Sequence, residues 1–189
     1  MKVVFVFVAI TIVSGQDPTT VCLPPQIQAG FFNFIDNSYG SYAADFSRGQ
    51  AAKFGANDDP RTVFDLRTFL AYNITKDDNC TVYRMDSSEA IFQCLPPTAY
   101  VISPNGTHLG GGADVLDVQT WELDLGQDTT MRLAFTLGSP RLPLVRHIKR
   151  TGSGSPLAVI IFYNPVTQVD PAVFTLPRSC FHSKLRPRL

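Results

Sequence analysis

The chain has 189 residues, of which 44% are hydrophobic, and it carries 16 Lys and Arg against 16 Asp and Glu. This length suits a single domain with a real hydrophobic core. The formal net charge is +0 and the sequence contains no basic stripe, so we expect no nucleic-acid partner.

The first residues follow the pattern of a secretory signal peptide. Lys2 precedes an apolar run from Val3 to Val13, and the small residues Ser14 and Gly15 follow it. We predict a signal peptide over 1–15, cleaved after Gly15, and a secreted, extracellular domain over 16–189. The run is shorter than the roughly 20 apolar residues that a spanning helix needs, so the protein is not expected to span a membrane.

The next elements show a period of two, which indicates strands. In residues 41–47, Tyr42, Ala44 and Phe46 alternate with residues that point the other way. Residues 63–74 are ambiguous: their apolar positions fit a strand, but the stretch could also begin as a helix.

A β-hairpin is predicted further along the chain. Residues 118–126 and 131–138 each alternate apolar and polar side chains, and the link "GQDTT" between them is rich in turn formers. Residues 157–164, "LAVIIFYN", are apolar on both faces and therefore predict a central strand. Residues 170–180, "DPAVFTLPRSC", are interpreted as a short strand that ends at Leu176-Pro177.

Many short strands separated by Gly, Pro and Asn turns are typical of an all-β sandwich or half-open barrel. The basic cluster 146–150 lies next to the loop "TGSGS" and is interpreted as a solvated loop, with a dibasic processing site as the alternative.

The four cysteines are Cys22, Cys80, Cys94 and Cys180, and none has a CxxC spacing. An even number in an oxidising compartment predicts disulfide bonds, and spacing alone leaves three pairings open. Three Asn-x-Thr triplets, at Asn73, Asn79 and Asn105, predict N-glycosylation. Asn105 is the strongest candidate because an Asn-Gly turn should be exposed.

Catalytic motifs are not evident. His108, His147 and His182 have no metal-motif spacing, and no G-x-S-x-G elbow accompanies the glycine loop at 108–114. We therefore predict no enzymatic activity and no required cofactor. The acidic pairs 58–59 and 77–78 could bind calcium, although solvated turns are the default interpretation, and metal ligands stay unknown.

Four stretches together resemble the ependymin-related proteins, in particular the secreted invertebrate type. They are "CLPPQIQAGFFNF", "SYGSYAADFSRGQAAKF", "AYNITKDDNC" and "NPVTQVDPAVFTLPRSC". The closing stretch matches the family at every anchor, namely Asp170, Pro171, Phe174, Pro177 and Cys180. The similarity spans about residues 22–180, which leaves 181–189 as an expected loose tail.

The resemblance implies an all-β fold of two stacked, curved antiparallel sheets, a half-open barrel similar to lipoprotein carriers, around an apolar pocket. It implies a secreted glycoprotein, a homodimer, that binds hydrophobic small molecules such as lipids or fatty acids. The alternative is a calcium-associated protein of cell–matrix adhesion, extracellular matrix or biomineral matrix.

The resemblance also implies the bond Cys80–Cys180. The vertebrate family members carry a further cysteine before the penultimate strand, and "LPLVRHIKR" lacks it here. Cys22 is then left with Cys94 or with an intermolecular bond, and we predict Cys22–Cys94. Alternation alone selects the candidate pocket residues, and for any single one of them plain core is the default interpretation. They are Phe46, Phe64, Leu66, Trp121, Leu123, Leu133, Phe135 and Phe162.

Overall fold

The computed structural model describes residues 16–55, 60–183 and 185. The predicted signal peptide, 1–15, lies outside them. The described strands, in chain order, are β1 (Gln26–Asn33), β2 (Tyr39–Asp45), β3 (Gln50–Gly55), β4 (Arg61–Asp65), β5 (Leu70–Ile74), β6 (Cys80–Arg84), β7 (Tyr100–Val101), β8 (Thr107–Gly111), β9 (Asp114–Gly126), β10 (Thr129–Thr136), β11 (Pro143–Arg150) and β12 (Pro156–Val166). Four short 3₁₀ turns accompany them in the described ranges: η1 (Pro18–Thr20), η3 (Ser87–Glu89), η4 (Pro171–Phe174) and η5 (Arg178–His182).

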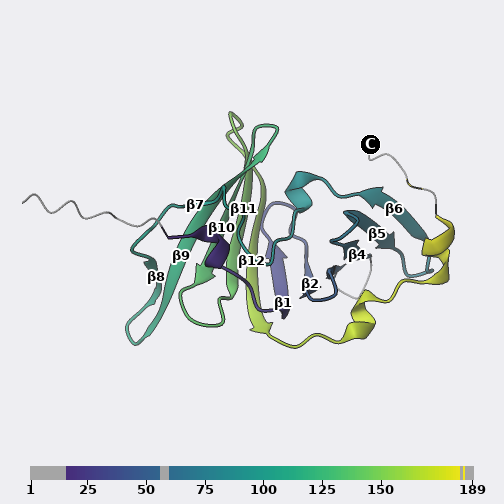
Figure 1. Cartoon of the computed structure of the whole chain (residues 1–189), viewed down its shortest axis with the longest axis horizontal. Helices are drawn as coiled ribbons and strands as arrows, with labels where there is room; N and C mark the ends of the chain where they lie inside the picture. Colours follow the sequence, from purple (N-terminus) through teal and green to yellow (C-terminus); the bar gives the residue numbers. More distant parts are fainter. Residues whose placement is uncertain (1–15, 56–59, 184, 186–189) are drawn as a thin grey trace, which may run out of the picture.

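All of these strands belong to one open sheet. Its order is β6-β5-β4-β3-β2-β1-β12-β11-β10-β9-β7, with β8 paired to β9, and the described ladders are antiparallel. The all-β prediction is confirmed. The strands nevertheless form one sheet where two stacked sheets were predicted, because β1 is hydrogen-bonded along both edges. Phe31 lies opposite Gly40 of β2 and opposite Phe162 of β12, so the two halves of the chain are joined (Figure 1).

The predicted hairpin and the predicted central strand are both present. Strands β9 and β10 pair with Leu123 opposite Met131 and Trp121 opposite Leu133, which places the apolar set on one face. Strand β12 lies between β1 and β11 in the middle of the sheet. Both predictions succeed because the apolar pattern was long enough to define a strand and its faces.

The ambiguous residues 63–74 form a second kind of hairpin. Asp65 ends β4, and its carboxylate accepts hydrogen bonds from the backbone N–H groups of Arg67 and Thr68, at 2.9 and 3.2 Å. The turn ends at Phe69, which has a positive φ of 56°. An aspartate that bonds the backbone two and three residues later forms a tight turn, so the stretch is neither one strand nor a helix.

The side of the sheet that carries Ala43, Ala52 and Val63 is covered by residues 167–183, which we call the C-terminal segment. Phe174 of η4 and Cys180 of η5 are buried in this cluster. In Figure 1 the segment, drawn in yellow, runs from the end of β12 to the region of β4, β5 and β6. It thereby covers one face of the N-terminal half of the sheet.

The closing stretch 170–180 is not the predicted strand. The Asp170 carboxylate caps η4 by accepting a hydrogen bond from Ala172 N at 2.9 Å, and Pro171 follows it in the first turn. This arrangement favours 3₁₀ turns over an extended strand. The expected loose tail begins inside η5, and Leu185 forms a bridge with Val82.

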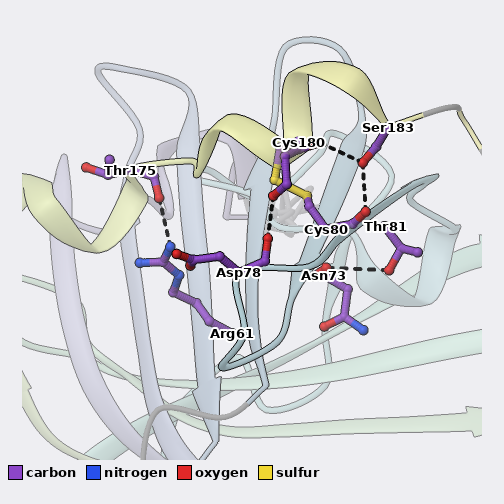
Figure 2. Close-up of a disulfide and its surroundings, with 9 residues drawn as sticks. Arg61, Asn73, Asp78, Cys80, Thr81, Thr175, Cys180 and Ser183 are labelled. Atoms are coloured by element: carbon purple, nitrogen blue, oxygen red, sulfur yellow. Dashed lines mark hydrogen bonds between the residues drawn. A yellow bond between two sulfur atoms is a disulfide. The ribbon is translucent and has the colours of Figure 1, made fainter.

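Figure 2 shows how this segment is fastened. Cys180 is bonded to Cys80 at the start of β6, and Ser183 Oγ donates a 2.7 Å hydrogen bond to the Cys80 carbonyl. Arg61 Nη2 donates to the Thr175 carbonyl at 2.9 Å. The disulfide is the pair that the family resemblance implies, and it joins a 3₁₀ turn, rather than a last strand, to the sheet.

Candidate functional site

The opposite face of the sheet borders a cavity of about 380 Å³. Its lining includes Phe64 of β4 and Phe135 of β10, which are six strand spacings apart in the sheet order. In a flat sheet those strands would be about 29 Å apart, given a spacing of about 4.8 Å. A cavity of this size can touch both only if the sheet curves strongly, so we call this side of the sheet the concave face.

Most of the lining is apolar. Paired residues on neighbouring strands share a face, and the register therefore carries an apolar surface from β1 to β10. The principal members of this wall are Ile27, Phe31, Met131, Ile148, Ile160 and Phe162. Ile27 and Met131 are almost fully buried. The cavity is thus bounded by packed core on the sheet side.

A segment that we call the strap, residues 87–95, closes the other side. It begins with η3, where Asp86 and Glu89 form a reciprocal capping box. Its end is paired with the N-terminal segment through Leu23 N to Gln93 O, at 2.7 Å, and Leu95 N to Val21 O, at 3.0 Å. The disulfide Cys22–Cys94 lies within this pairing. These bonds hold the strap over the cavity, which residues 88–93 and 95 line.

The bond Cys22–Cys94 is also a pair that was predicted. Together with Cys80–Cys180 it leaves no described cysteine unpaired. The two bonds serve different faces. Cys22–Cys94 holds the strap on the concave face, whereas Cys80–Cys180 holds the C-terminal segment on the other face of β2 to β6.

Arg146 of β11 is the main polar group in the apolar wall. It lies opposite Ile160 of β12 and Leu133 of β10, both of which line the cavity. Its Nη2 donates a hydrogen bond to the Ser88 carbonyl of the strap. Its Nε is buried without a hydrogen-bond partner. Burial lowers the pKa of the guanidinium, but arginine keeps its charge in proteins.

Tyr42 of β2 shares this environment. Burial raises the pKa of its phenol, and the nearby Arg146 charge opposes that effect. Its ring makes an edge contact with Phe162, with centroids 6.1 Å apart. Within the described part of the chain, the Tyr42 hydroxyl forms no hydrogen bond. The phenol is therefore a neutral donor that lines the same cavity as the guanidinium.

Two further charged groups line the cavity. The Lys53 ammonium lies 4.8 Å from the centre of the Phe31 ring, a cation–π contact. Glu89 accepts hydrogen bonds from the Tyr83 hydroxyl at 3.1 Å and from Asp86 N at 3.3 Å. Lys53, Glu89 and Arg146 are the charged side chains of the described lining, so its formal charge is +1.

The eight predicted pocket residues divide into two groups. Phe64, Leu133, Phe135 and Phe162 line the cavity. The other four lie outside the lining, because two are core and two occupy turns. Trp121 and Leu123 are fully buried beneath Val21 and Leu95, while Phe46 and Leu66 lie in the turns after β2 and β4 and pack on a neighbouring cluster.

Sequence reasoning did not find Arg146, Tyr42 or the strap as parts of the cavity. Arg146 was placed in a solvated loop, and this was wrong, because residues 143–150 form β11. The available signal was the alternation of Arg146 and Ile148, which share one face, with His147, which lies on the other. The strap gave no signal because it has no periodicity.

The predicted glycosylation sites differ in exposure. Asn79 and Asn105 are exposed in the loops before β6 and β8. Asn73 lies within β5, between β4 and β6, and its Oδ1 is buried without a hydrogen-bond partner. A glycan needs open solvent around the asparagine, so the environment favours Asn79 and Asn105.

The calcium prediction stays open. Asp58 and Asp59 lie outside the described residues, and Asp77 and Asp78 are exposed in the loop after β5. Among the residues that the structure describes, no group of three or more His, Cys, Asp or Glu side chains could hold a metal ion. His108 pairs with Asp117 at 2.7 Å on the surface.

None of the helical elements in the described ranges is long and apolar enough to cross a membrane.

Comparison with known proteins supports the fold and nothing further. No protein-family model matches the chain, and no curated protein matches it. The chain is similar in structure to an uncharacterized conserved protein from Thermus thermophilus, with a TM-score of 0.56 and 10% sequence identity. The match covers 91% of this chain and 96% of that one. At this identity the likeness concerns the fold alone.

Proposed function

We propose that this protein is a secreted glycoprotein that binds hydrophobic small molecules, of the lipid or fatty-acid class, in the cavity between the concave face and the strap. The observation that carries the proposal is an apolar cavity of about 380 Å³ beneath a disulfide-anchored cover. Ligand sites are typically concave, mostly apolar, and have a few polar groups at fixed positions.

The energetics favour an apolar occupant. Each 100 Å² of ligand surface removed from water contributes about 2.5 kcal/mol before the cost of association. Polar solutes would gain little, because few polar groups face the cavity. The wall is anchored in the core of the sheet, so a ligand would meet a largely preformed surface.

We also propose that the chain belongs with the ependymin-related proteins. The order of its four matching stretches and the bond Cys80–Cys180 support this. The sheet pair of the expected half-open barrel would then correspond to the two halves of the one curved sheet, with the cavity as the apolar pocket. Homodimer formation and calcium binding follow from the resemblance alone.

The deciding experiment is native mass spectrometry of the full chain from a secretory host, followed by organic extraction and lipid analysis. A stoichiometric apolar ligand released on unfolding would support the proposal. Leu133→Trp places a larger side chain in the cavity and should weaken binding, whereas Leu116→Trp, at an exposed site on β9, should not. An empty protein that also fails to bind a fluorescent fatty acid would contradict the proposal and favour a calcium-associated matrix role.

A further inference from the structure

Arg146 has N–H donors in the cavity that lack hydrogen-bond partners. A guanidinium has five N–H donors, and the described hydrogen bonds of this one are limited to Nη2 with the Ser88 carbonyl. The Nε atom is buried and has no partner. No ion pair of Arg146 within 4.0 Å is found among the described residues. Arg146 is half-buried, and a cation with a buried, unpaired N–H and no adjacent anion is costly, so the cavity favours an anionic occupant.

The carboxylates near Arg146 do not replace such an anion. Glu89 and Asp86 act on the guanidinium from a distance, and both are engaged in the cap of η3. The Glu89 oxygens accept hydrogen bonds from Tyr83 and from the Asp86 backbone. They offset part of the Arg146 charge without forming the close, paired hydrogen bonds that a guanidinium makes with a carboxylate.

We propose, on the basis of the proposed function, that the cavity takes a single-chain hydrophobic molecule with a terminal carboxylate, which pairs with Arg146. The Tyr42 hydroxyl lies in the same environment and would donate a second hydrogen bond. The chain of the ligand would then lie along the wall formed by Phe31, Phe162 and Leu133. The volume, about 380 Å³, is near the lower end of the range for ligand sites, which favours one chain.

The test measures displacement of cis-parinaric acid, a fluorescent long-chain carboxylate, by hexadecanoic acid and by hexadecan-1-ol below their aggregation limits. The full glycosylated chain should prefer the acid to the alcohol by at least about tenfold, as a hydrogen bond to a charged group predicts. Binding of both with equal affinity would overturn the head-group proposal while leaving the proposed function intact. Binding of neither would contradict the proposed function itself.

Variants then locate the head group. Arg146→Met replaces the cation with an apolar side chain of similar length. It should weaken hexadecanoate binding by about 10- to 150-fold while changing hexadecan-1-ol binding by about threefold or less. Arg146→Lys should give an intermediate loss, because it keeps the charge but not the planar fork. The matched control is Arg132→Met on β10, since Arg132 pairs with Glu122 on the opposite face of the sheet.

The alcohol also reports whether the cavity of Arg146→Met is intact. If that variant does not fold, Tyr42→Phe removes only a hydroxyl and should still reduce the preference for the acid. Equal losses for acid and alcohol in a folded variant would show a structural role and overturn the proposal. An unchanged affinity for the acid in Arg146→Met would overturn it as well.

Discussion

The bond Cys80–Cys180 joins the C-terminal segment to β6, and removing it tests how much this restraint contributes to the free energy of unfolding. The double substitution Cys80→Ser, Cys180→Ser opens a loop with a sequence separation of 100 residues. Chain-entropy reasoning assigns a loop of that size about 4.7 kcal/mol, and measured losses for native disulfides are about 2–5 kcal/mol. Cys180 is also buried beside Phe174, so a serine there adds an apolar loss.

Equilibrium denaturation with guanidinium, followed by tryptophan fluorescence, measures this difference. Trp121 is the only tryptophan of the chain, and it lies in the other half of the sheet from Cys80. A loss below about 1 kcal/mol would refute the loop-entropy reasoning. In protein that remains folded, ligand affinity should be unchanged, because the C-terminal segment covers the face opposite the cavity.

The bond Cys22–Cys94 provides the comparison. Its separation is 72 residues, for which the same reasoning gives about 4.4 kcal/mol. Its removal should also loosen the strap, which would keep only its backbone hydrogen bonds to the N-terminal segment, so that bound ligand dissociates faster. Equal ligand dissociation rates in the two disulfide variants, measured by stopped-flow displacement, would contradict the separate roles of the two bonds.

Three further predictions follow from single sites. Burial raises the pKa of Asp45, but hydrogen bonds from Ser47, Gln26 and Arg48 N outweigh it and the net pKa is lowered. The Asp45 contribution to stability is thus present above the unfolded-state pKa of about 3.9 and is lost as pH falls through the folded value. Asp45→Asn should lower the free energy of unfolding by about 1–3 kcal/mol at pH 7. In a series of denaturation curves at decreasing pH, the difference between the variant and the unsubstituted protein should become smaller. Leu123→Ala should lower stability by about 2–5 kcal/mol, measured by denaturation, because Leu123 is fully buried. Asn105→Gln and Asn79→Gln should each reduce the mass of the secreted protein by one glycan, whereas Asn73→Gln should not, and an intact-mass loss at Asn73 alone would contradict this.

The regular strands were predictable because their pattern is local. Strand β12 and the β9–β10 hairpin are long enough for alternation to define both the strand and its faces. Residues 63–74 were not predictable in this way, because one aspartate turn converts an apparently continuous apolar pattern into two strands. The closing stretch 170–180 contains the same apolar residues as a strand, but Asp170 and Pro171 cap a 3₁₀ turn.

The arrangement of the halves depends on contacts that are distant in sequence. The pairing of β1 with β12 joins strands from opposite ends of the chain, as in Phe31 with Phe162, and it makes one sheet where local patterns allow two. The strap lies over the cavity because of its pairing with residues 21–23, and nothing in residues 87–95 themselves specifies that position. Neither feature has a local signal.

At the candidate site, the local sequence around Arg146 and the position of Arg146 in the fold point to different environments. In the sequence, Arg146 begins a basic cluster, which usually indicates a solvated loop. In the fold, β1 and β12 connect two curved halves, and β11 presents Arg146 and Ile148 to the same apolar cavity. A charge retained on the buried face of a central strand lowers stability unless a partner compensates it. Residues whose local sequence pattern disagrees with their place in the fold tend to be functional. Arg146 is such a residue, and it lines the cavity.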